Sequence, residues 1–473
     1  MKKESRNRAL VVGTLTYSIG NIGTKILSFL IVPLYTFYIS TADMGDYDLL
    51  MTTASLFSPL ITLKIAEASY RWIINDRENA GKTVSATYQL LLQNCLLCAL
   101  IILGINHFIP IWNCYYFIGI LLTDRIMECL QKLLRGFGNQ KLFAVSGLLY
   151  TAFMVTYNLI QITVFHAGVT AMLQGVLFGH IFTILFILIC EKRLRVFDLP
   201  KGYRKLQLDM IKYSAPLVPS TLCWWVMSAS DRYVIRWFLG KSANGIFAVA
   251  HKFPTILNTI FVMFNNAWTD MVLSQMQDSD DSVEYSSKLF KRYYTFSFGM
   301  ALVLIPVTKI VTQLVLSDAY KSGSTLIGFL YIGAIFQGFS SFCSVGYLKD
   351  KKTIGAASSS AFGAVVNFVF DLATMKFIGL YAAAISTLLG YFAMWALRMH
   401  DIKDVFPIKI DKKLFGLNLG LCLIMAIVST KSTLYIDAIL LLAAMIYFYI
   451  FNRDFIHKSV SKVLGKIQKK VAK

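Results

Sequence analysis

Three charged residues interrupt a long apolar run of this 473-residue sequence and could bind an ionic ligand: Lys64, Glu67 and Arg71. They are three and four residues apart, so a helix places all three on one face. A charge inside a bilayer is costly and usually faces a polar cavity or a partner. The spacing therefore predicts a small charged surface near one end of a membrane helix.

Other apolar runs also carry ionisable side chains. They are Lys25, Asp124, Arg125, Glu128, Asp231, Arg232, His251, Lys252, Lys309 and Asp371. Asp124 and Glu128 are four residues apart and share a helix face. Lys25 either lines a cavity or pairs with Asp124. Cations outnumber carboxylates, and guanidinium and ammonium groups bind phosphate through charge-assisted hydrogen bonds, so a cavity lined by them suits an anionic headgroup.

These residues divide into two predicted roles. The cations expected to line a central cavity and hold substrate are Lys25, Arg71, Arg125, Arg232 and Lys252. The carboxylates expected to couple an ion or to form charge pairs are Glu67, Asp124, Asp231 and Asp371.

Each assignment has a structural alternative. Arg71 could anchor a helix end, and Asp231 with Arg232 could form a pair that holds two lobes together. Lys252 lies close enough to a helix end to extend its ammonium to the membrane surface, and we assign Lys309 to that behaviour.

Catalytic and metal-binding motifs are missing from the sequence. It has no GxSxG, P-loop or HExxH pattern, and its six histidines are not spaced as metal ligands. The acidic stretch Asp278–Asp281 is interpreted as a solvated loop, and the eight cysteines as apolar membrane residues. We therefore expect no enzyme activity, no cofactor and no metal site.

Composition predicts an all-α polytopic membrane protein. The chain is 56% hydrophobic and only 15% charged, unlike a soluble protein of this length. Since a spanning helix needs about 20 apolar residues, fourteen segments qualify: 10–38, 46–66, 83–105, 109–131, 142–165, 170–190, 213–239, 246–272, 291–316, 323–347, 355–376, 379–399, 413–430 and 434–451. The fourth is the weakest, because charges interrupt it.

The loop charges predict the orientation. Most of the 46 Lys and Arg residues lie in alternate connections and in both termini, which the positive-inside rule places in the cytoplasm. The net charge of +20 accordingly favours anionic lipids over nucleic acid. The stretch Phe455–Lys473 alternates apolar residues with lysines and predicts a basic amphipathic helix on the inner leaflet.

A weak internal repeat suggests two lobes. With an offset of 200 residues, Tyr38 aligns with Phe238, Ile39 with Leu239, Gly45 with Gly245 and Tyr47 with Phe247. Parallel repeats of this kind are one known transporter plan. We expect two pseudo-symmetric six-helix lobes, 1–190 and 213–399, joined by a basic cytoplasmic linker, 191–212. Two extra helices, 413–451, and a cytoplasmic tail, 452–473, complete the chain.

The residues around this repeat carry a family resemblance. Asp231-Arg232-Tyr233 ends a Pro-interrupted segment and is followed by G-x-F-x-x-A from Gly245. With Pro33–Leu50 and Ser69–Trp72, this pattern resembles the polysaccharide flippases of the exporter superfamily that includes the multidrug and toxin extruders. The resemblance covers most of the chain, is fairly specific for the family and is unspecific for its cargo.

That resemblance implies a function. The expected activity is to move undecaprenyl-pyrophosphate-linked oligosaccharide across the bacterial cell membrane, with energy from a proton or sodium gradient or from the membrane potential. The product would be capsule, O-antigen or exopolysaccharide, and a polysaccharide polymerase and glycosyltransferases would be partners. A multidrug or small-molecule exporter and a peptidoglycan-precursor flippase are the alternatives within transport. A membrane glycosyltransferase and a non-transporting scaffold are the rivals outside it.

Overall fold

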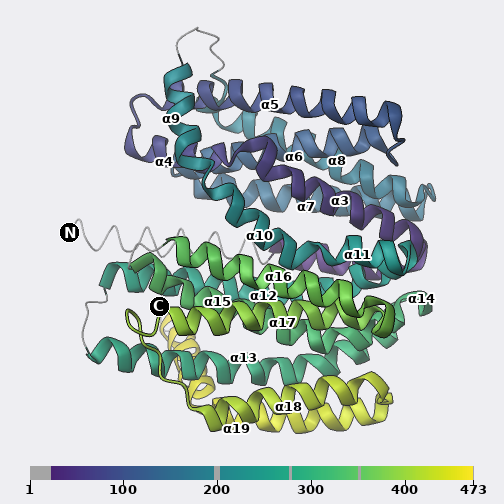
Figure 1. Cartoon of the computed structure of the whole chain (residues 1–473), viewed down its shortest axis with the longest axis vertical. Helices are drawn as coiled ribbons and strands as arrows, with labels where there is room; N and C mark the ends of the chain where they lie inside the picture. The colour runs from purple at the N-terminus through teal and green to yellow at the C-terminus, as the bar shows by residue number, and fades with distance from the viewer. Residues whose placement is uncertain (1–22, 197–202, 276–279, 350–352, 472–473) are drawn as a thin grey trace. The chain divides into compact units, whose positions relative to one another are not determined.

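The structure, a computed structural model, describes residues 23–196, 203–275, 280–349 and 353–471 (Figure 1). In these residues the chain is helical apart from short connections, as the composition predicts. Contacts divide the chain into two compact units, Met1–Gly245 and Ile246–Lys473, called unit 1 and unit 2 below. The predicted lobe boundaries at 190 and 213, and the linker and tail beyond them, remain predictions.

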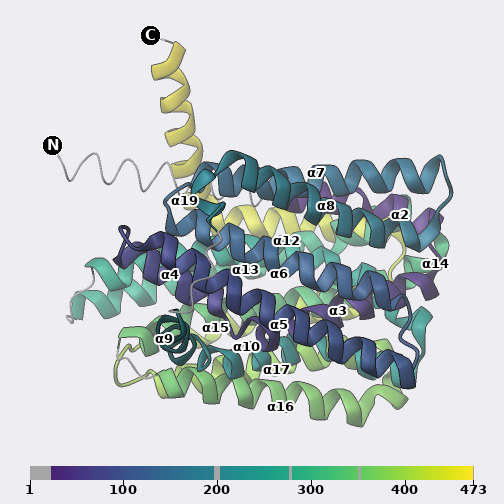
Figure 2. The same ribbon diagram turned by 90° about the horizontal axis from the view of Figure 1, so that it is seen from above.

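Unit 1 is a bundle of long helices and shorter pieces. The elements are α2 (Val32–Tyr38), α3 (Thr41–Thr62), α4 (Ile65–Asn75), α5 (Ala80–Phe108), α6 (Cys114–Gly136), α7 (Gln140–Thr163), α8 (Gly168–Cys190), η1 (Lys192–Leu194), α9 (Arg204–Ser214), α10 (Leu217–Ala229), α11 (Asp231–Phe238) and the first turn of α12 (Lys241–Gln275). Helices α7 and α8 lie side by side, and α6 packs against α3, α4 and α8 (Figure 2).

Unit 2 contains the remainder of α12 and the later helices. They are α13 (Asp280–Val315), α14 (Asp318–Lys321), η2 (Ser322–Leu326), α15 (Ile327–Lys349), α16 (Thr353–Ile378), α17 (Leu380–Asp401), α18 (Lys412–Lys431) and α19 (Leu434–Val471). Its core is aromatic: the rings of Phe298, Phe339 and Phe415, from α13, α15 and α18, lie 5.4–6.2 Å apart. Such rings bury a large apolar area in a rigid shape.

Membrane-spanning length is common in the described residues. Ten helices are long and apolar enough to cross a bilayer, and the bent pair α3–α4 makes an eleventh. Helix α6 and the shorter apolar helices over 23–38 and 217–229 coincide with the three other predicted spans. The exact number of fourteen remains a prediction. The stretch 455–471 continues α19 as helix, and 278–279 of the acidic stretch lie outside the described residues.

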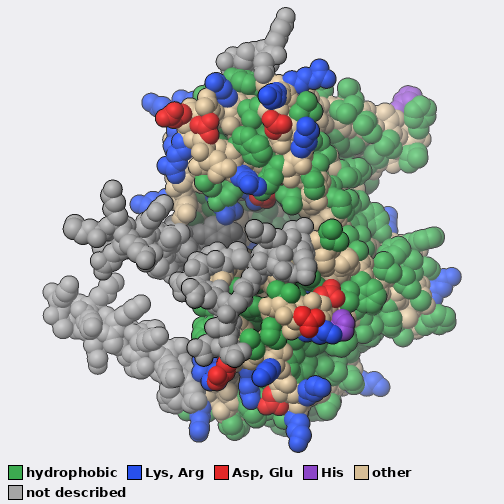
Figure 3. All heavy atoms as spheres, turned by 60° about the vertical axis from the view of Figure 1, so that its left-hand side comes forward, with side chains coloured by type: hydrophobic (Ala, Val, Ile, Leu, Met, Phe, Trp, Pro, Cys, Tyr) green, Lys and Arg blue, Asp and Glu red, His purple; other side chains and the backbone are tan. Residues whose placement is uncertain are grey.

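Helix α5 has an exposed apolar face of the kind that contacts lipid. It exposes Leu92, Leu96 and Leu100 by 58–60%, spaced four residues apart on one face, while Leu91 and Cys95 are buried. In Figure 3 the charged side chains gather toward the end of the helices that faces the viewer, and hydrophobic side chains cover the flank to the right. An apolar flank with charged ends is the pattern of a membrane helix bundle.

Two glycines at the predicted repeat offset touch each other's helix. A Cβ on Gly45 would lie 1.9 Å from the carbonyl oxygen of Lys241, and a Cβ on Gly245 would lie 1.9 Å from that of Thr41. The contact is reciprocal, and the two glycines are 200 residues apart, which is the offset of the predicted repeat. Only glycine permits this approach, and Asn244 Nδ2 adds a 2.8 Å hydrogen bond to the carbonyl oxygen of Gly45.

Candidate functional site

The span α3–α4 is broken in the membrane. The two helices meet at an angle of 50°, because Leu63 and Lys64 adopt left-handed backbone conformations with φ of 46° and 56°. Such conformations cost a non-glycine residue about 1–2 kcal/mol. Asn94 of α5 donates a 2.8 Å hydrogen bond to the carbonyl oxygen of Ile61, and Thr62 Oγ1 accepts one from the Lys64 N–H at 3.2 Å. Neighbouring side chains thus satisfy backbone groups that the break releases.

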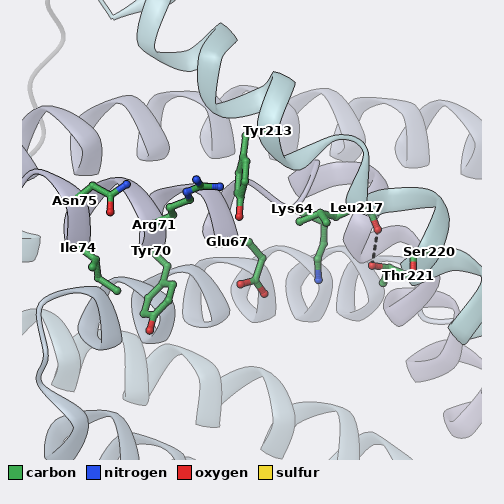
Figure 4. Close-up of a pocket in the computed structure, with 10 residues that line it drawn as sticks. All are labelled: Lys64, Glu67, Tyr70, Arg71, Ile74, Asn75, Tyr213, Leu217, Ser220 and Thr221. Atoms are coloured by element: carbon green, nitrogen blue, oxygen red, sulfur yellow. Dashed lines mark hydrogen bonds between the residues drawn. The ribbon is translucent and has the colours of Figure 1, made fainter. Parts of the chain in front are cut away.

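A pocket of about 570 Å³ opens at this break (Figure 4). Helix α4 and its start provide one wall and α9–α10 the other. The lining residues are Lys64, Glu67, Tyr70, Arg71, Ile74, Asn75, Tyr213, Leu217, Ser220 and Thr221. Lys64, Glu67 and Arg71 line it together, as their spacing predicts, although only Glu67 and Arg71 lie within α4 and Lys64 lies in the break that precedes it.

Arg71 lies against an aromatic ring. Its guanidinium carbon is 4.6 Å from the centroid of the Tyr213 ring, and Figure 4 shows the two side chains next to each other. Tyr213 is positioned by α9, whose Met210 is buried in a small apolar cluster with Ile65 and Leu90. A cation over a ring face gains about 0.5–1 kcal/mol at an exposed site. The stacking therefore orients an otherwise exposed arginine side chain.

Glu67, predicted as a coupling or pairing carboxylate, is paired. Lys132 of α6 lies 2.5 Å from its Oε1. Among the described residues no carboxylate forms an ion pair with Lys64 or Arg71. The pocket therefore presents two cations whose charge is not neutralised by a neighbouring acid.

Arg125, predicted to bind substrate, is buried in a charged cluster with 8% exposure. Its guanidinium donates to Asp124, to Glu128 and to the hydroxyl of Ser58 on α3. His180 of α8 lies 3.7 Å from Asp124. The sequence placed the two acids on one face, and the structure shows that both enclose the arginine between them.

Arg232, also predicted to bind substrate, is buried beside α3. Its Nε lies 3.4 Å from Asp48, and its Nη1 donates to the carbonyl oxygen of Ser228 at 2.6 Å. Arg236 and Lys241 lie 3.2 and 3.4 Å from Asp46. Sequence reasoning missed both aspartates, although they stand within the stretch that carries the family resemblance.

The other predicted site residues are spread over both units. Lys25 is exposed and Lys252 is half-buried. Asp231 and Asp371 are completely buried. Within the described residues, no group of three or more His, Cys, Asp or Glu side chains could hold a metal ion.

Two cations of unit 2 correct the sequence interpretation. Lys309, assigned to the membrane surface, is only 6% exposed; it lies 3.4 Å from Asp437 and donates to the carbonyl oxygen of Ser432 at 2.8 Å. Arg398 belongs to the cytoplasmic charges that the positive-inside rule counts, at the inner end of the predicted span 379–399, but it is 2% exposed and is enclosed by α15, α16 and α17. The carbonyl at a helix end attracts a cation, and this position next to α18 explains why Lys309 turns inward.

Comparison with solved structures shows which proteins share this fold. The lipid II flippase MurJ, in an inward closed conformation, matches with a TM-score of 0.73 and 14% identity, over 93% of this chain and all of that chain. A multidrug resistance MATE family transporter of the MOP superfamily, in an inward-facing conformation, matches with a TM-score of 0.59 and 15% identity, over 82% and 95% of the two chains. This chain therefore shares its fold with the lipid II flippase MurJ and with this MATE family transporter.

The amino-acid sequence also identifies the family of this chain. The family described as "Polysaccharide biosynthesis protein" matches residues 10–269, which include the broken helix and the pocket. The chain belongs to this polysaccharide biosynthesis protein family, as the resemblance predicts. The comparison with curated protein sequences gives no match.

Proposed function

We propose that this protein flips undecaprenyl-pyrophosphate-linked oligosaccharide repeat units across the bacterial cell membrane for the synthesis of a surface polysaccharide. The cargo enters from the inner leaflet, and no covalent bond changes. Both termini are cytoplasmic, and a polymerase and glycosyltransferases act next to the protein. Of the predicted cations, Arg71, Lys25 and Lys252 contact the cargo, and Arg125 and Arg232 stay beside the carboxylates that hold them. The predicted carboxylates Glu67, Asp124, Asp231 and Asp371 serve coupling or charge pairing.

One observation carries the proposal. The match to the polysaccharide biosynthesis protein family, over residues 10–269, includes the part of the chain in which Lys64 and Arg71 line a pocket at a helix break. A cationic pocket suits a phosphate-bearing cargo. A broken helix that lines a cavity is a recurrent feature of transporter binding sites.

A second candidate function has support from the fold. The match to a lipid II flippase over 93% of this chain favours another lipid-linked cargo, a peptidoglycan precursor. Loss of such a flippase would be lethal in every growth condition, whereas loss of a surface-polysaccharide flippase would spare growth once glycan initiation is blocked.

Mass spectrometry of the polyprenyl-lipid fraction from cells depleted of this protein tests the proposal. We expect a pyrophosphate-linked oligosaccharide to accumulate and to resist an externally added glycan-modifying enzyme until the cells are opened. Its mass would also define the repeat unit. Accumulation of lipid II instead would favour the second function. An unchanged lipid pool in a strain that makes the glycan would contradict both and favour drug or metabolite export.

A further inference from the structure

The structure separates the cations of unit 1 into two groups. Arg125, Lys132 and Arg232 are engaged by carboxylates. Lys64 and Arg71 are not in an ion pair with any described carboxylate, and both line the pocket at the helix break. We infer that this pocket is a binding site for the phosphate group of an anionic lipid, with Lys64 and Arg71 as the residues that contact it.

The charge of the pocket supports this inference. Three of its lining residues are charged: two are cations, and the third, Glu67, is neutralised by Lys132 at 2.5 Å. The pocket therefore keeps a positive charge that a phosphate would balance. A bound phosphate would place its oxygens among charge-assisted donors, which make stronger hydrogen bonds than neutral ones.

The geometry of Arg71 suits an oxyanion. Its guanidinium lies over the Tyr213 ring at 4.6 Å, so one face is covered while the N–H groups around its edge stay available. A guanidinium edge can bind two phosphate oxygens at once. Across the pocket, α10 contributes the hydroxyl group of Ser220, whereas that of Thr221 donates to the carbonyl oxygen of Leu217 at 3.0 Å (Figure 4). These elements enclose a space in which a phosphate can be held from both walls.

The rim of the pocket favours a lipid over a free phosphate. Ile74 and Leu217 line it and are 46% and 39% exposed. Apolar side chains beside a cationic pocket match a ligand that has a charged headgroup and a hydrocarbon tail.

The inference rests on the proposed function only for the choice between two lipids that share this chemistry. A polyprenyl pyrophosphate would be cargo, and phosphatidylglycerol would be a bound membrane lipid. We would purify the full chain, reconstitute it in nanodiscs of zwitterionic phosphatidylcholine, and measure binding of farnesyl pyrophosphate by calorimetry. Phosphatidylglycerol would then be added to the nanodiscs as a competitor.

Matched variants connect any binding to this pocket. Arg71→Gln should weaken farnesyl pyrophosphate binding by about tenfold or more, as expected for loss of charged hydrogen bonds, and Lys64→Gln should weaken it similarly. Arg77→Gln is the control, because Arg77 is an exposed arginine six residues further on that does not line the pocket. Tyr213→Phe keeps the ring and should bind normally, whereas Tyr213→Ala should bind less tightly.

A variant that should bind more tightly distinguishes an effect of pocket charge from an effect of misfolding. Glu67→Gln removes the one acid of the pocket and should tighten binding. Competition by phosphatidylglycerol at similar concentration would identify a membrane-lipid site, and its failure would identify a pyrophosphate site. Equal binding by Arg71→Gln, Arg77→Gln and the unchanged protein would overturn the inference, as would absence of binding of both lipids. An unchanged polyprenyl-lipid pool in depleted cells, with pocket binding intact, would instead contradict the proposed function.

Discussion

Arg71 in unit 1 and Arg398 in unit 2 have opposite surroundings, although both stand near the predicted inner end of a membrane helix. Arg71 is exposed and lies over one aromatic ring. Arg398 is 2% exposed and donates hydrogen bonds to Ser340, Ser359 and Ser360 at 2.8–3.0 Å. The guanidinium of Arg398 is committed to joining three helices, whereas that of Arg71 is available to a ligand. Equal charges in a sequence can therefore serve stability in one place and binding in another.

Replacing Arg71 and Arg398 in turn should give the largest difference in stability between two variants. Arg398→Ala leaves the buried hydroxyl groups and carbonyl oxygen that it binds without their donor, and since each unsatisfied buried group costs about 1–3 kcal/mol, we expect the largest loss of stability among these variants. Arg71→Gln should leave thermal unfolding in detergent almost unchanged and reduce export of the lipid-linked oligosaccharide. A stable Arg398→Ala protein would remove the distinction between the two residues.

Lys309 and Lys64 extend the comparison to lysines. Lys309→Ala leaves Asp437 buried without its cation and should lower stability by about 3–5 kcal/mol. In the double variant Lys309→Met with Asp437→Leu, no charge remains buried, so much of that loss should be recovered. Lys64→Gln should lower the stability less than Lys309→Ala does, as measured by thermal unfolding. A Lys309→Ala protein as stable as the parent would show that the pair contributes nothing.

Substitutions at the reciprocal glycine contact test whether unit 1 also contains residues that serve stability. Gly45→Ala and Gly245→Ala each place a Cβ at 1.9 Å from a backbone oxygen, so each should destabilise by about 1–3 kcal/mol. Similar losses are expected because the two contacts are equivalent. Gly420→Ala on α18 is the control: nothing lies within 4 Å of its Cβ, and alanine stabilises a helix by about 0.8–1 kcal/mol relative to glycine. Unequal losses would show that the two contacts are not equivalent.

The smallest expected effect lies at the end of α8, outside the membrane-spanning segments. Hydrogen bonds from Arg193, and then from Asn139, lower the pKa of Glu191 from its ordinary 4.5 to about 2. A carboxyl whose folded pKa is depressed stabilises the protein above its unfolded pKa, and this contribution is lost as the pH falls from about 4.5 toward 2. Glu191→Gln should therefore melt slightly earlier than the parent at pH 7, and the difference should shrink at pH 3. A difference that is independent of pH would exclude this linkage.

The local features of the candidate site were predictable. Glu67 and Arg71 share a face of α4 because the helical repeat relates residues four apart; Lys64 precedes the helix, and all three line one pocket. Asp124 and Glu128 lie on one face for the same reason and enclose Arg125. The break at Leu63–Lys64 was not predicted, because neither residue type favours a left-handed backbone and the stabilising amide of Asn94 comes from another helix.

The sequence by itself determined the membrane character, the approximate helices, the family and the repeat offset that brings Gly45 to Gly245. These follow from composition and from short-range periodicity, which act along the chain. Only the tertiary structure decided which charges are neutralised. Asp48 meets Arg232 and Lys309 meets Asp437 because distant helices pack together, and that packing leaves Lys64 and Arg71 as the cations available at the pocket.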